Sequence, residues 1–152
     1  MEESAVVVEA TVIQEEVHKQ YYHNAAWTAE RALEFTLEQA NQRLHHLISE
    51  GVSQWLNHAH LLIGAVHHHQ LVLAPAGTIH GYVLRGSRIH DVVGNESSSI
   101  QPLRIFSQLI VGRLEAGDHV LFCTPSLLDY FSLEKLRRTI VDYQPREAVH
   151  VI

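Results

Sequence analysis

Apolar residues recur every three or four positions between residues 25 and 50. The repeating positions are Ala29, Leu33, Leu37, Ala40, Leu44 and Ile48. This spacing places them on one face of an α-helix, so the pattern predicts an amphipathic helix over this segment. Asn24 or Thr28 could cap its start, and Gly51 could supply the left-handed residue that ends it.

Shorter apolar runs elsewhere in the first hundred residues predict β-strands. Residues 5–13, AVVVEATVI, are rich in β-branched side chains and fit a strand. After Trp55 the segments 58–66, 70–76, 78–85 and 88–93 read as four consecutive strands, with turns at HHHQ and RGS. We therefore expect an antiparallel meander, whose incomplete alternation suggests strands covered on both faces.

The second half of the chain continues with alternating elements. Residues 94–99 read as a loop, which is followed by an apolar element at 104–114, a turn at 115–118 and a strand at 119–124. A helix is expected next, for which Ser132 is a plausible N-cap, and residues 144–149 look like the first turn of another. The pattern as a whole predicts the α+β class.

Composition narrows the possible functions. The 152 residues suit a single domain, and 46% hydrophobic with 18% charged residues is a globular composition. A net charge of −6 argues against nucleic acid as a partner. Because Cys123 is the sole cysteine, an internal disulfide is excluded. The apolar runs are too short for a membrane span. The first residues are acidic, whereas a signal peptide begins with basic residues. We expect a cytoplasmic protein that does not insert into membranes.

Three ordered segments carry a resemblance to a known family. Gly77 stands at a turn between strands, and Tyr82, Arg85 and Gly86 follow in the next hairpin. Residues 112–132, GRLEAGDHVLFCTPSLLDYFS, form the second segment, and the helix over 29–47 forms the third. Together they resemble the PPM family of metal-dependent serine/threonine protein phosphatases. Residues 25–152 form the family-like region of one domain spanning 1–152, and residues 1–24 are atypical.

The resemblance implies a sandwich of antiparallel sheets flanked by helices, here without the family's terminal elements. It also implies two Mg²⁺ or Mn²⁺ ions held by aspartates, since hard ions prefer carboxylate oxygens. Thr78 and Pro125 stand at two of those aspartate positions, and none of the family's metal ligands is found in the chain. The sequence therefore resembles a degenerate, truncated phosphatase site with no metal ligand, no catalytic residue and no cofactor.

Histidines and Cys123 offer other chemistry. His58, His60, His67, His68 and His69 are weak candidates for a Zn²⁺ or Ni²⁺ site, because one sequence cannot show that they converge. Exposed or partly buried histidines are the more ordinary interpretation. Cys123 could be a nucleophile at a strand-to-helix turn, but a buried structural thiol is the more ordinary interpretation there too.

Three hypotheses follow from these observations. In the first, the chain is not an enzyme but a catalytically inactive phosphatase-like domain used for protein binding, regulation or scaffolding. In the second, it is a fragment of an active metal-dependent phosphatase. In the third, it is an unrelated α+β module that binds a transition metal through histidines. A protein partner or a homo-oligomer is expected, because open sheet edges tend to recruit another chain.

Overall fold

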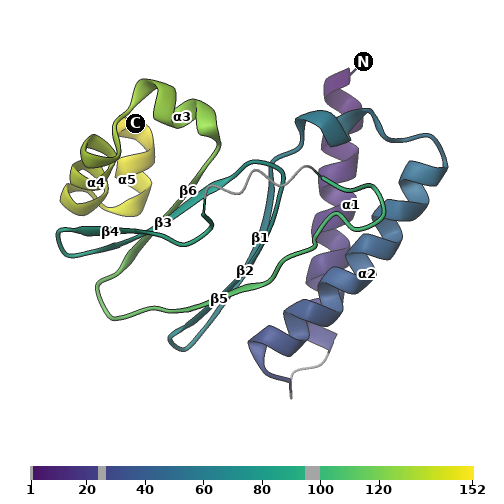
Figure 1. The fold of residues 1–152 in the computed structure, drawn as a ribbon, viewed down its shortest axis with the longest axis horizontal. Helices are drawn as coiled ribbons and strands as arrows, with labels where there is room; N and C mark the ends of the chain where they lie inside the picture. Colours follow the sequence, from purple (N-terminus) through teal and green to yellow (C-terminus); the bar gives the residue numbers. More distant parts are fainter. Residues whose placement is uncertain (1, 24–26, 95–99) are drawn as a thin grey trace. The chain divides into compact units, whose positions relative to one another are not determined.

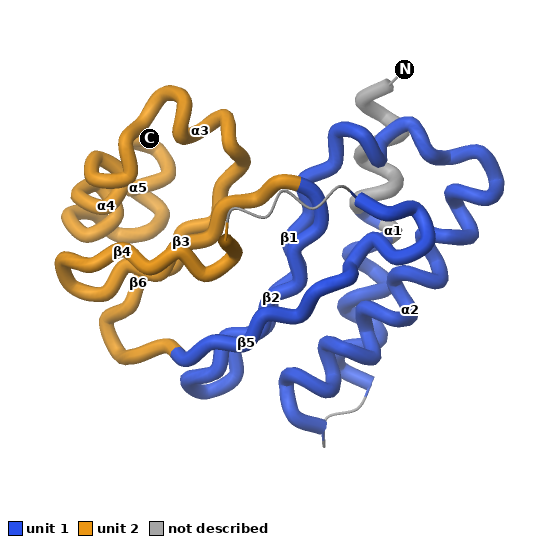
Figure 2. The backbone as a smooth tube through the Cα atoms, in the orientation of Figure 1, with its two compact units in different colours: residues 1–77, 98–113 blue, residues 78–97, 114–152 orange. Residues whose placement is uncertain are grey.

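The computed structural model describes residues 2–23, 27–94 and 100–152, with side chains at residue 11 and from 13 onward. The chain divides into two compact units (Figure 2). Unit 1 comprises residues 1–77 and 98–113, and unit 2 comprises 78–97 and 114–152. Each unit contains one small antiparallel sheet together with helices.

Unit 1 holds a three-stranded sheet in the order β1-β2-β5 beside two long helices (Figure 1). Its elements are α1 (Glu2–His23), α2 (Ala29–Ser49), a 3₁₀ turn (Gln54–His58), β1 (Leu61–His67), β2 (Gln70–Ala76) and β5 (Ile110–Arg113). One face of the sheet, including Val72 and Ala74, packs with the apolar face of α2 in a common core. The apolar residues that recur along α2 therefore form a large part of the core of this unit.

The predicted helix over 25–50 is confirmed as α2. The Thr28 hydroxyl caps it by accepting a hydrogen bond from the Arg31 backbone N–H at 3.3 Å. Gly51 follows the helix with φ +92°, in the left-handed region that the sequence indicated. The other cap candidate, Asn24, lies outside the described residues.

The strand predicted at residues 5–13 is wrong, because these residues belong to α1. Strand propensity is a weak prior that tertiary packing overrides. The missed signal lies just beyond the predicted strand. Ile13, Val17 and Tyr21 recur every four residues and pack against the core built on α2. A window confined to residues 5–13 could not include that period.

Unit 2 contains a second three-stranded sheet in the order β4-β3-β6, followed by three short helices. The elements are β3 (His80–Arg85), β4 (Arg88–Asp91), β6 (His119–Cys123), α3 (Pro125–Tyr130), α4 (Leu133–Asp142) and α5 (Pro145–Val151). Ser132 caps α4 as predicted, since its side chain accepts from the Lys135 backbone N–H. Leu136 of α4 and Ala148 of α5 are both buried.

The predicted four-strand meander is wrong at its centre. β1 pairs with β2 and β3 pairs with β4, but β2 and β3 are not neighbours. β2 pairs instead with β5, and β3 pairs with β6, so both hairpins recruit a strand from later in the chain. The sequence located each hairpin but contained no local signal for these distant partners.

The predicted α+β class with antiparallel sheets and helices is confirmed. The apolar element expected at 104–114 is a strand only over Ile110–Arg113. The loop expected at 94–99 lies outside the described residues from position 95 onward. In the described ranges, none of the helices is long and apolar enough to cross a membrane.

Candidate active site at the ends of β3 and β6

The start of β3 and the end of β6 lie side by side in unit 2. His80 and Cys123 are directly paired in the antiparallel ladder. Thr78 precedes this pair by two residues and Pro125 follows it by two, so the register leads both positions to the same end of the sheet. The two positions that the sequence singles out as former metal-ligand positions therefore follow the same end of the unit 2 sheet.

Pro125 begins helix α3 rather than occupying an open turn. It stands in the first turn of the helix, where a proline's fixed φ is favourable and its missing N–H costs nothing. Thr124 is the N-cap residue, but its side chain makes no capping hydrogen bond. Proline therefore stabilises the start of α3 while providing no side-chain oxygen to the site.

The side chains at these strand ends do not fit a pair of hard divalent cations. Thr78, Thr124 and Ser126 offer hydroxyl oxygens, whereas Mg²⁺ and Mn²⁺ sites are built largely from carboxylates. Across the described part of the chain, no group of three or more His, Cys, Asp or Glu side chains is arranged to hold a metal ion. No step of a reaction is therefore assigned to these residues through a metal.

Gly77 fixes the backbone that leads into the site. Its φ is +76°, and a Cβ atom at this position would overlap the carbonyl oxygen of Ala59. Only glycine combines that conformation with so close an approach. The glycine that carried part of the family resemblance is thus required by the geometry of the chain.

Arg85 and Asp118 form a hydrogen-bonded ion pair that joins β3 to the entry of β6. Arg85 Nε donates to Asp118 Oδ1 at 2.9 Å, and Nη2 donates to Oδ2 at 2.7 Å. The Asp118 side chain is only 2% exposed and also accepts from the Glu115 backbone N–H at 2.8 Å. The Arg85 guanidinium, with that N–H, lowers the pKa of Asp118 from 3.8 to about 2.

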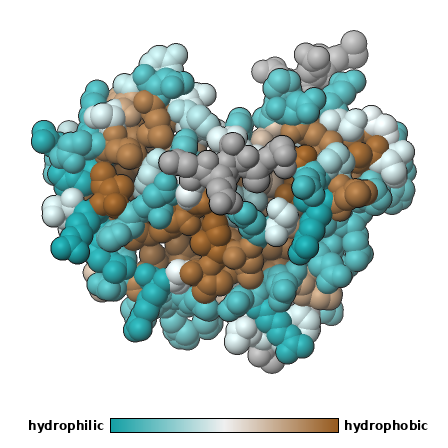
Figure 3. All heavy atoms as spheres, viewed as in Figure 1, coloured by the Kyte–Doolittle hydropathy of each residue, from teal (hydrophilic) through white to brown (hydrophobic). Residues whose placement is uncertain are grey.

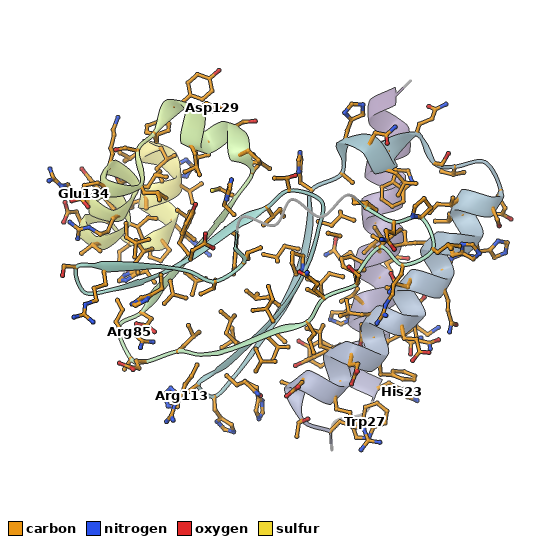
Figure 4. The ribbon with its side chains drawn as sticks, in the orientation of Figure 1. His23, Trp27, Arg85, Arg113, Asp129 and Glu134 are labelled. Atoms are coloured by element: carbon orange, nitrogen blue, oxygen red, sulfur yellow. The ribbon has the colours of Figure 1, made fainter. Side chains whose placement is uncertain are left out.

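The sequence indicated both members of this pair without showing that they meet. Arg85 belongs to the hairpin that carries the family resemblance, and Asp118 lies in the second family-like segment, residues 112–132. The β3–β6 pairing sets them opposite one another, with Glu115 as a further partner of Arg85 at 2.7 Å. Figure 4 labels Arg85 beside the chain that enters β6.

Cys123 resembles a structural thiol more than a nucleophile. It is half-buried, and burial raises the pKa of its thiol, which leaves less thiolate at neutral pH. Its ladder partner His80 has a buried Nδ1 atom without a hydrogen bond, and its ring stacks on Tyr82 with centroids 6.1 Å apart. The sequence-based preference for a structural cysteine agrees with this environment.

The candidate histidines all lie exposed in unit 1. His67 and His68 bring their rings to 4.2 Å at the β1–β2 turn, where His68 adopts φ +54°. His58 ends the 3₁₀ turn, and His60 precedes β1. Within the described ranges, these histidines join no set of three metal-ligating side chains. Their role as metal ligands stays an untested prediction.

An acidic residue and four aromatic residues remain to be placed. Asp129 is exposed on α3 (Figure 4). Trp55, Tyr82 and Phe106 are buried core residues. Trp27 is half-buried, and Arg31 lies 4.8 Å from its ring centroid, which makes it a rim residue.

Comparison with solved structures identifies the fold, although no family model and no curated protein matches the sequence. The serine/threonine phosphatase PstP/Ppp of Mycobacterium tuberculosis matches with TM-score 0.75 at 16% identity, over 97% of this chain and 74% of that one. The catalytic domain of PstP in complex with two manganese ions matches with TM-score 0.68 at 15% identity. That match covers 95% of this chain and 71% of the PstP chain. PppA, a key regulatory component of T6SS in Pseudomonas aeruginosa, matches with TM-score 0.70 at 19% identity. That match covers 95% of this chain and 71% of PppA.

These matches confirm the expected PPM phosphatase-like fold. Because the sequence identities are below 20%, the likeness is one of fold alone. They also overturn one expectation. The sequence predicts a protein that is not an enzyme, because the family resemblance implies aspartates where Thr78 and Pro125 stand. The structures that share the fold across nearly the whole chain include serine/threonine phosphatases, one of them holding two manganese ions. The expectation that the chain is not an enzyme is therefore contradicted, and what the comparison shows is a phosphatase-like fold.

Proposed function

We propose that this chain is a protein-binding unit of the phosphatase type that acts in the dephosphorylation of phosphoserine and phosphothreonine proteins. In this proposal, carboxylates that the chemistry requires come from beyond the described residues or from a second polypeptide. A regulatory role accords with the likeness to PppA, which is described as a regulatory component.

The observation that carries the proposal is the geometry at the ends of β3 and β6. The ladder that pairs His80 with Cys123 leads Thr78 and Pro125 to one end of the sheet. Gly77, with φ +76°, directly precedes Thr78, and Pro125 is the first residue of α3. This register supports a phosphatase-like site at these strand ends, where the nearby side chains offer hydroxyls in place of carboxylates.

The proposal is tested by returning carboxylates to this frame. The double variant Thr78→Asp/Pro125→Asp is compared with Thr78→Asn/Pro125→Asn, which has nearly the same shape without the charge. Phosphate release from a phosphothreonine peptide and from p-nitrophenyl phosphate is measured in Mn²⁺ and in EDTA. We expect the aspartate variant to release phosphate on the order of tenfold faster than the asparagine variant, and only in Mn²⁺.

Two results would count against the proposal. Equal rates for the two variants would mean that positions 78 and 125 do not face the reacting phosphate. A wild-type rate in Mn²⁺ equal to that of the aspartate variant would mean that the chain's own residues already suffice.

A further inference from the structure

Strand β1 is an edge of the unit 1 sheet. The sheet order β1-β2-β5 gives β1 a neighbour on one side alone. A β-strand at an edge presents a row of backbone N–H and C=O groups that can pair with another chain. Among the described residues, no backbone hydrogen bond from outside the sheet reaches Leu62, Gly64 or Val66.

The β1–β2 hairpin determines which backbone groups face outward. His67 pairs with Gln70 across a two-residue turn, and in such a turn the closing pair exchanges hydrogen bonds. Hydrogen-bonded and non-hydrogen-bonded pairs alternate along such a ladder. The backbone groups of Leu61, Ile63 and Ala65 therefore bond to β2. Those of Leu62, Gly64 and Val66 point away from β2, toward the open edge. Pro75, which has no N–H to donate, lies opposite Leu62 as this alternation requires.

An uncharged groove runs beside this edge. It has a volume of about 530 Å³ and is lined by α1 between Ile13 and Tyr22, by Leu33, and by β1 from Leu61 to Val66. None of its lining residues is Asp, Glu, Lys or Arg. Val66 and Tyr22 are 61% and 68% exposed, so large apolar side chains reach the surface here, as they do elsewhere on the molecule (Figure 3).

Two other edges of the sheets differ from β1. β4 carries Arg88 and Asp91, and β5 ends in Arg113, which is labelled in Figure 4. Charged residues on short edge strands are a common protection against unwanted pairing. β1 spans seven residues, and residues 59–69 contain no Asp, Glu, Lys or Arg. The remaining edge, β6 (HVLFC), is also free of these charges but spans only five residues, so β1 is the longest edge strand and has no charged protection.

We propose that the β1 edge is a docking surface for the β1 strand of a second copy of this chain. The match in charge supports this occupant, because a charged strand would leave its charges desolvated and unpaired in an uncharged groove. The sequence of β1, LLIGAVH, is itself apolar and free of acidic, lysine and arginine side chains. It has the chemistry that the groove requires.

The geometry of β1 is also self-complementary. Its outward-facing residues are symmetric about Gly64, so two copies related by a two-fold axis pair Gly64 with the partner's Gly64 and Leu62 with the partner's Val66. Directly opposite residues point to the same face of a sheet. The partner's Ile63 and the partner's Ala65 therefore face the groove beside α1, and the two three-stranded sheets join into one.

Disulfide trapping tests the register of this pairing. Leu62→Cys and Val66→Cys are made separately in a Cys123→Ser background and oxidised alone or as a mixture. Hydrogen-bonded antiparallel pairs have Cα atoms about 5.5 Å apart, which suits a disulfide. We expect a cross-linked dimer in the mixture, at least tenfold more than in either variant alone. Equal cross-linking in all three samples, or none in the mixture, would overturn the proposal.

Light scattering at tens of micromolar provides a second test with a matched control. Val66→Lys places a charge on the proposed edge, and Val111→Lys places the same charge at an exposed valine on the opposite edge of the same sheet. We expect a dimer mass for the wild type and Val111→Lys, and a monomer mass for Val66→Lys with an unchanged circular dichroism spectrum. A monomeric wild type, or a dimer that survives Val66→Lys, would refute the proposal.

Discussion

At the scale of single residues, the Asp118 carboxylate forms a hydrogen-bonded ion pair with Arg85. It accepts two hydrogen bonds from the guanidinium and one from the Glu115 backbone N–H. Bidentate contacts between arginine and a carboxylate have a fixed geometry, and the near-complete burial of Asp118 protects this one from water. The pair therefore fixes the end of β3 against the entry of β6, one strand length from the candidate site.

The lowered pKa of Asp118 predicts how stability depends on pH. The folded-state pKa of about 2 lies below the ordinary value of 3.8, so this carboxylate stabilises the fold above about pH 4. That contribution is lost as the pH falls from about 4 toward 2. We expect Asp118→Asn to lower the melting temperature by several degrees at pH 7, and by progressively less as the pH approaches 2.

The matched control for this prediction is Glu115→Gln, which removes the more exposed partner of Arg85. The Glu115 side chain is 62% exposed, and exposed ion pairs contribute little to stability. Its melting temperature should stay close to that of the wild type at every pH. Thermal melts between pH 2 and pH 7 provide the measurement. If Asp118→Asn lost as much stability at pH 2 as at pH 7, the ion pair would not be the cause.

At the scale of elements, local patterns predicted the structure wherever local chemistry decides it. β2 spans 70–76 as expected, and α2 and α4 begin after the caps predicted at Thr28 and Ser132. The errors lie where distant contacts decide. α1 takes its helical form against α2, and the two hairpins separate because each pairs with a strand from later in the chain.

Helix caps allow an element-scale prediction. The Ser132 side chain accepts a hydrogen bond from the Lys135 N–H, whereas Thr124, the N-cap residue of α3, makes no such bond. We expect Ser132→Ala to lower the free energy of unfolding by about 1 kcal/mol. Thr124→Ala, the matched control, should change it by less than about 0.5 kcal/mol. Urea unfolding measures both, and equal losses would contradict the assigned cap.

At the scale of the whole molecule, the fold and the site differ in how far the sequence reveals them. The ordered motifs around Gly77, Arg85 and Asp118 indicated the phosphatase-like fold because backbone geometry and an ion pair depend on them. The same reasoning identified Thr78 and Pro125, yet it went too far in concluding that the chain is not an enzyme. A ligand can come from a residue far away in sequence or from another chain, and no local pattern records that.

The proposed function requires that positions 78 and 125, at the ends of β3 and β6, converge on one metal site from which carboxylates have been lost. The most direct test is a calorimetric titration with Mn²⁺ of Thr78→Asp/Pro125→Asp against Thr78→Asn/Pro125→Asn. The account predicts that the aspartate variant binds Mn²⁺ at least tenfold more tightly, a difference of about 1.4 kcal/mol. Equal affinities would show that these two positions do not converge on a common site, and would contradict the account.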